Sequence, residues 1–115
     1  MLSAWADLVP GVVAIRRSRL GSYVLDASSR EAWHVPAHRV ETVDPTGAGN
    51  VYSASFAAHY FVNRRPLLEA ACLASAAGAA AVLEKGLPPI SDALRTWIRD
   101  AAAGLRPDVK SLGRV

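Results

Sequence analysis

Cysteine is almost absent from this chain of 115 residues, since Cys72 is the only one. A single cysteine excludes an internal disulfide and any metal site built from several thiolates. Cys72 lies in an alanine-rich stretch, where we expect a small buried side chain. His34 and His38 have no cysteine or acidic partner at metal-binding spacing, so we predict surface or turn positions for them and no metal site.

Long hydrophobic runs are also missing. The apolar stretch 70–83 is too short to span a bilayer, and Gly78 interrupts it. The amino terminus lacks the charged and then apolar pattern of a signal peptide. We therefore expect a cytoplasmic protein without membrane contact.

The charge is only mildly basic, with 13 Lys and Arg against 10 Asp and Glu. The basic clusters at 16–19 and 64–65 are far apart and lack interleaved aromatic residues, so we do not expect nucleic-acid binding. A hydrophobic fraction of 51% in a chain of this length predicts one packed domain.

Short apolar runs in the first third of the chain predict strands. Residues 12–15 form a continuous run that is typical of a buried strand in a parallel sheet. Residues 22–25 and 32–35 flank the polar segment 26–30, which predicts a hairpin.

Helical patterns fill the rest. We predict helices over 49–62, 66–85 and about 91–104, and a frayed tail over 105–115 without chemistry. The first helix has Val51, Ser55, Ala58 and Val62 at helical spacing. The second carries small residues on one stripe, which permits either close packing of another helix or contact with a flat ligand such as a purine. The fold class is therefore α/β, with a few strands followed by about three helices.

The most informative stretch is 43–50, Val-Asp-Pro-Thr-Gly-Ala-Gly-Asn. Asp44 or Thr46 can cap a helix, and glycine at 47 and 49 lets the backbone approach a bound group. A helix that begins here directs unpaired amides at one point, which suits a phosphate. The alternative is an ordinary glycine loop before an ordinary helix. The Gly-x-x-x-x-Gly-Lys phosphate loop is absent, and no third glycine at 52 completes a dinucleotide motif.

The segment 44–52 resembles the second signature of the ribokinase-like, or PfkB-type, carbohydrate kinases, Asp-Thr/Pro-Thr-Gly-Ala-Gly-Asp-x-Phe. The resemblance extends over about residues 10–103 and implies the carboxyl-terminal part of that fold, because a full kinase is two to three times longer. It also implies that Gly47, Ala48 and Gly49 form an anion hole for the transferred phosphoryl group. Asn50 stands at the position of the catalytic Asp.

The resemblance assigns further residues to the nucleotide. Thr46 belongs to the signature. Ser75 stands where the family has an Asn in a helix that borders the adenine. Arg16 lies where the family has Thr-x-Gly beside the nucleotide, and it is either a phosphate contact or a solvated loop residue.

The implied activity is ATP-dependent phosphoryl transfer to a sugar-like alcohol. ATP and Mg²⁺ are the expected cofactors, although no metal ligand can be assigned. Asn50 can orient a hydroxyl but cannot accept its proton at neutral pH. The alternative is therefore a non-catalytic pseudokinase fragment that binds a nucleotide or another protein. Because the sheet would be partial, we also expect self-association or a missing amino-terminal half as a partner.

Overall fold

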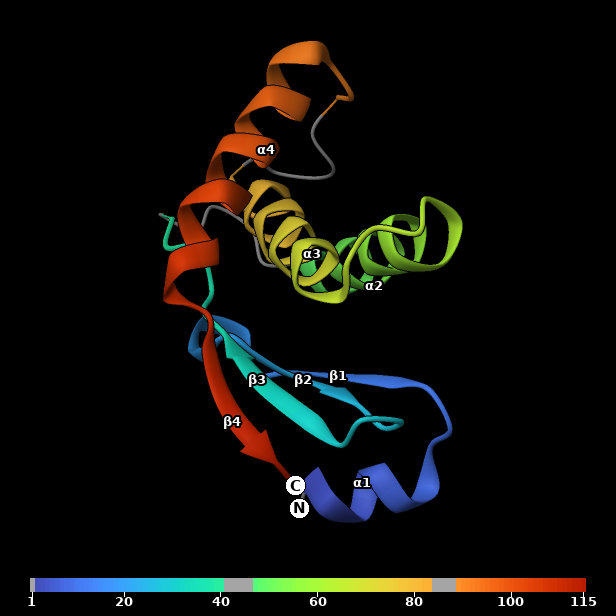
Figure 1. The fold of residues 1–115 in the computed structure, drawn as a ribbon. Coiled ribbons are helices and arrows are strands. Elements are labelled where there is room, and N and C mark those ends of the chain that lie inside the picture. The colour runs from blue at the N-terminus through green and yellow to red at the C-terminus, as the bar shows by residue number, and fades with distance from the viewer. Residues whose placement is uncertain (1, 41–46, 84–88) are drawn as a thin grey trace.

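The computed structural model describes residues 2–40, 47–83 and 89–115. Thr46 and Asp44 lie outside these residues, so their predicted roles stay predictions. The described part contains four helices and a four-stranded sheet, as the predicted α/β class requires. Figure 1 shows helix α1 (Leu2–Leu8) on one side of the sheet and the remaining helices on the other.

The sheet is antiparallel throughout, with strand order β1-β2-β3-β4. Its strands are β1 (Val12–Arg16), β2 (Ser22–Asp26), β3 (Glu31–Val35) and β4 (Lys110–Arg114). The hairpin β2–β3 is confirmed, with Val24 opposite Trp33. The parallel pairing expected for β1 is wrong, because its partner in the described residues is the antiparallel β2. The turn Ser18–Leu20 reverses the chain between them.

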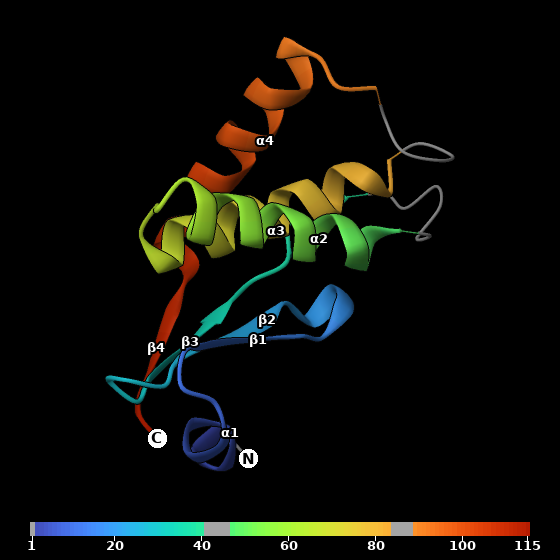
Figure 2. The same ribbon diagram turned by 90° about the vertical axis from the view of Figure 1, so that its right-hand side faces the viewer.

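The predicted frayed tail is also wrong. After α4 (Asp92–Leu105) and a 3₁₀ turn (Arg106–Asp108), the chain enters β4 and pairs with β3. The pairing places Ser111 opposite Trp33, with an irregularity between Ala32 and Trp33. The added strand covers the edge of β3, and it brings the carboxyl end close to α1 (Figures 1 and 2).

Two helices lie antiparallel above the sheet (Figure 2). The first, α2 (Ala48–Ala57), continues into a π-helical turn, η2 (Ala58–Val62), and the second is α3 (Leu67–Ala81). The three predicted helices are thus confirmed within the described residues, although α3 ends at Ala81, before the predicted end at about 85. The apolar face predicted for the first helix, which includes Val62, is wrong. Val62 is 76% exposed, whereas Tyr52 and Phe56 are buried.

The core lies between the sheet and the helices. Val24 and Val35 pack from the sheet against Tyr52 and Phe56 of α2 and against small residues of α3. Nine residues of α3 are buried, and seven of them are alanines. Alanine keeps the neighbouring backbones close, so the helix-packing reading of the small-residue stripe is confirmed. Cys72 is buried in the same helix, as predicted.

Within the described residues, every helix is too short or too polar to cross a bilayer.

Gly78 provides a test of this helix packing. A Cβ at Gly78 would lie 3.5 Å from the Ala48 carbonyl oxygen and 3.7 Å from Tyr52 Cβ, which is ordinary contact. Gly78→Ala should therefore raise the free energy of unfolding by about 0.5–1 kcal/mol through helix propensity. Gly78→Leu should lower it by about 1–3 kcal/mol because its branch overfills the helix contact. Urea unfolding measures both, and a stable Leu variant would contradict the packing.

Candidate anion site at the start of α2

The first turn of α2 begins at a glycine that no other residue type would readily replace. Gly47 is the N-cap and has φ 84°, ψ −8°, in the left-handed region that favours glycine. As a glycine, it has no side chain that could accept a hydrogen bond from the helix. Val51 N donates to Gly47 O at 2.9 Å, which is the first hydrogen bond of the turn recorded between described residues.

Three amides precede that bond, those of Ala48, Gly49 and Asn50. The first amides of a helix have no partner within the helix, and the helix dipole adds positive potential there. Among the described residues, none accepts a hydrogen bond from these three amides. The backbone at 47, 48 and 49 is half-buried, and the Asn50 side chain is exposed on the same turn. This geometry can bind an anion.

Arg16 reaches the same turn from the end of β1. A Cβ at Gly49 would overlap Arg16 Nη1, so the guanidinium lies directly against the Gly49 backbone. Its Cζ is also 5.9 Å from the centre of the Tyr52 ring. In the described part of the chain, no carboxylate forms an ion pair with Arg16. The structure therefore brings Arg16, a predicted nucleotide contact, together with the predicted glycine segment at 47–49.

Tyr52 fixes the position of this turn, and the sequence did not single it out as a site residue. Its hydroxyl donates to Ser22 Oγ at 3.3 Å, and both side chains are buried. Burial raises the pKa of the Tyr52 phenol, while the hydrogen bond with Ser22 and the charge of Arg16 oppose that rise. Tyr52 thus links the start of α2 to β2 and to Arg16. The sequence contains a signal for this role, because Tyr52 and Phe56 are large apolar residues one helical turn apart.

Ser75 is half-buried on α3, three residues before Gly78. Residues three apart lie on the same side of a helix, and Gly78 faces Ala48 and Tyr52. Arg17, next to Arg16, turns instead to Tyr23 and donates to its hydroxyl at 3.0 Å.

The two histidines predicted at surface or turn positions contact other parts of the chain. His34 Nε2 forms a hydrogen bond with the carbonyl of Leu20 at 2.8 Å. His38 packs edge-on against the ring of Trp97 at 5.3 Å. In the described residues, no group of three or more His, Cys, Asp or Glu side chains could hold a metal ion.

Comparison with known proteins identifies the family of the chain. The model of the pfkB family carbohydrate kinases matches residues 3–93. The chain belongs to this family. No curated protein sequence matches it significantly.

Solved structures agree on the fold. The chain is similar to a probable sugar kinase from Rhizobium etli CFN 42, with 28% identity and a TM-score of 0.71 over 90% of this chain and 30% of that one. It is similar in fold to a nucleoside kinase of Methanocaldococcus jannaschii (21% identity, TM-score 0.71, 87% of this chain and 33% of that one). It also matches the ribokinase of Thermotoga maritima (22% identity, TM-score 0.67, 90% and 32%). The chain thus spans about a third of the length of these proteins.

The anchoring role of Tyr52 can be tested by removing its hydroxyl. Tyr52→Phe leaves Ser22 Oγ buried without its partner and should lower the free energy of unfolding by about 1 kcal/mol. Tyr23→Phe removes an exposed hydroxyl bonded to Arg17 and should change it by less than about 0.5 kcal/mol. Equal effects in urea unfolding would show that the buried bond does not hold α2 on the sheet.

Proposed function

We propose that this chain is the phosphate-binding part of a kinase that transfers the γ-phosphoryl group of ATP to a sugar-like alcohol. The single observation that supports this most is the close approach of Arg16 to the first turn of α2, whose amides have no hydrogen-bond acceptor among the described residues. A transferred phosphoryl group needs charge stabilisation, and backbone amides supply it without reorganisation. Gly47, Ala48 and Gly49 would form the anion hole, and Arg16 would contact a phosphate oxygen of the nucleotide.

The described residues fit a phosphate group. Gly49 has no side chain to block the amides, and Arg16 has no carboxylate partner there that would compete with an anion. Thr46 and Ser75 would complete the nucleotide side. Mg²⁺ would arrive bound to ATP and would supply charge neutralisation between its phosphates. Such a site needs few protein ligands, and we assign none.

Asn50 limits the rate of phosphoryl transfer. It lies one residue after Gly49 and is exposed at the anion site, so its amide oxygen could accept the hydrogen bond of an acceptor hydroxyl and orient it. It cannot take the proton, and loss of a general base typically costs about 10²–10⁴-fold in rate. Weak transfer is therefore expected.

The same residue favours the second candidate function. If no other group takes the proton, the chain would be a nucleotide-binding or protein-binding module without turnover. The kinase and the nucleotide-binding module share the proposed anion site and differ only in the chemical step.

The two functions separate in a test with Asn50→Asp. ATP binding is measured by calorimetry with Mg²⁺ present, and ADP release is then measured with a panel of pentoses and hexoses. We expect the Asp variant to gain about 10²–10⁴-fold in sugar-dependent ADP release, because it restores a base at the hydroxyl. Asn63→Asp is the matched control, since it adds the same charge at the exposed end of η2 and should not change the rate.

Binding without turnover in both the native chain and Asn50→Asp would favour the module. The absence of ATP binding in both would contradict the kinase and the nucleotide-binding module and would leave only the protein-binding module.

A further inference from the structure

A second concave site lies away from the start of α2. It is a cavity of about 750 Å³ between the first half of α3 and α4, with one wall from η2. Pockets that bind small molecules typically measure about 300–1,000 Å³. Gly78 of α3 meets Ala48, whereas Glu69, nine residues earlier, lines this cavity. At 1.5 Å per residue the two places on α3 are roughly 13 Å apart.

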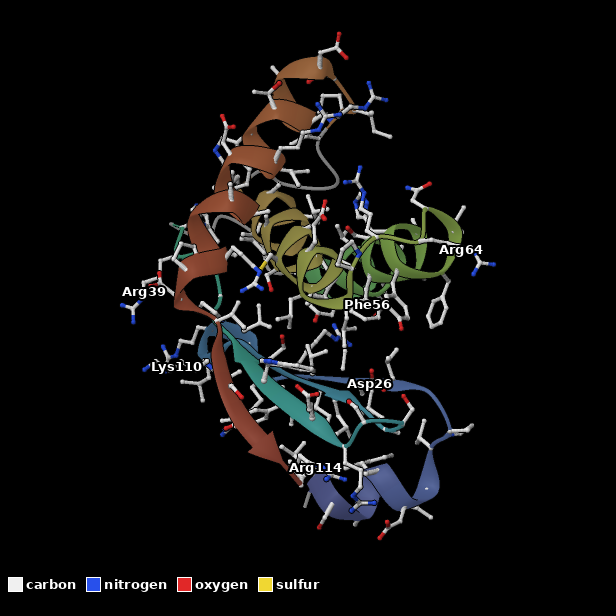
Figure 3. The ribbon with its side chains drawn as sticks, in the orientation of Figure 1. Asp26, Arg39, Phe56, Arg64, Lys110 and Arg114 are labelled. Carbon is white, nitrogen blue, oxygen red and sulfur yellow. The ribbon has the colours of Figure 1, made fainter. Side chains whose placement is uncertain are left out.

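The lining is strongly cationic. The described residues that line it include four arginines, Arg65, Arg95, Arg99 and Arg106, and one carboxylate, Glu69. The net charge of the whole chain is only +3, so this is a local concentration. Figure 3 shows nitrogen-tipped side chains that project from α4 and from the α2–α3 end into the space between them.

The spacing on α4 places like charges together. Arg95 and Arg99 are one helical turn apart, and Arg106 follows about two turns later on the same side. Like charges four residues apart destabilise a helix unless a counter-charge is near. Arg95 pairs with Asp92 at 3.1 Å. In the described residues, Arg99 and Arg106 form no ion pair.

The opposite wall carries polar atoms that have no partner among the described residues. Arg65 Nη1 pairs with Glu69 at 2.6 Å, but Arg65 Nε and His59 Nδ1 are shielded from solvent and form no hydrogen bond within residues 2–40, 47–83 and 89–115. Burial, together with the charge of Arg65, lowers the pKa of His59. His59 belongs to the π-helical turn, and such turns occur frequently at functional sites. An acceptor group at this wall would compensate the excess of donors.

The cavity also has an apolar part. Leu73 and Ile98 line it together with Ala102. A pocket that combines apolar surface with a few convergent polar groups suits a ligand with both a carbon skeleton and charge. Arginine binds phosphate through two parallel hydrogen bonds, which makes it the side chain most often used for this group.

We propose that the cavity between α3 and α4 binds a small phosphorylated metabolite, as a second anion site separate from the start of α2. Arg99 and Arg106 bind the phosphoryl group, and the surface formed by Leu73 and Ile98 contacts the carbon skeleton. The site does not depend on phosphoryl transfer at Asn50.

Calorimetry with glucose 6-phosphate, inorganic pyrophosphate and glucose tests this proposal. The native chain should bind the first two and not glucose. The double variant Arg99→Gln/Arg106→Gln should weaken binding of glucose 6-phosphate by about tenfold or more, because two charge-assisted contacts are lost. The matched control is Arg39→Gln/Arg114→Gln, which removes the same charge at two exposed positions outside the cavity lining (Figure 3), and it should stay within about twofold.

Equal weakening in both double variants would overturn the proposal, since it would indicate a general charge effect. Greater weakening in Arg16→Gln than in Arg99→Gln/Arg106→Gln would assign the ligand to the start of α2 and would also overturn it. Absence of binding by the native chain at millimolar ligand concentration would also overturn the proposal. Arg99→Gln alone, at an exposed position without an ion pair in the described residues, repeats the test if the double variant unfolds.

Discussion

The contact between Arg16 and the first turn of α2 is the interaction on which the proposed anion site depends. It brings a full positive charge to the end of a helix that already has positive potential, which typically costs about 0.3–1 kcal/mol. The Tyr52 ring, 5.9 Å from Arg16 Cζ, offsets this by a similar amount, about 0.5–1 kcal/mol at an exposed position. The two effects nearly cancel. An anion between the guanidinium and the amides would interact favourably with both.

The rest of the structure holds that contact in place. Tyr52 ties α2 to β2 through Ser22, and the alanines of α3 let α2 pack closely above the sheet. Arg16 is the last residue of β1 and lies at the start of α2. The turn that follows β1 returns the chain antiparallel into β2. The site therefore combines a strand end with a helix end, and neither would form it alone.

The sequence predicted the elements whose signals are local. The hairpin over 22–35 and the three later helices follow from alternation, turn residues and helical spacing, and the glycine segment at 47–49 follows from its backbone requirements. β4 could not be predicted, since Lys110–Arg114 has little strand propensity and includes Gly113. It becomes a strand because the edge of β3 is available to pair with it.

Other features depend on tertiary packing in the same way. The buried face of α2 is set by where Tyr52 and Phe56 meet the sheet, and the nearly uniform apolar pattern of the helix did not specify it. The approach of Arg16 to Gly49, 33 residues away, has no local signal. The arginines of α4 show regular spacing in the sequence, but only the arrangement of α3 and α4 places Arg65 opposite them.

Backbone amide NMR during titration with a non-hydrolysable ATP analogue tests the central claim most directly. If the start of α2 binds phosphate, the amides of Ala48, Gly49 and Asn50 should shift most, together with the Arg16 side-chain signal. Saturable binding that leaves these three amides unmoved and shifts signals elsewhere would contradict the account.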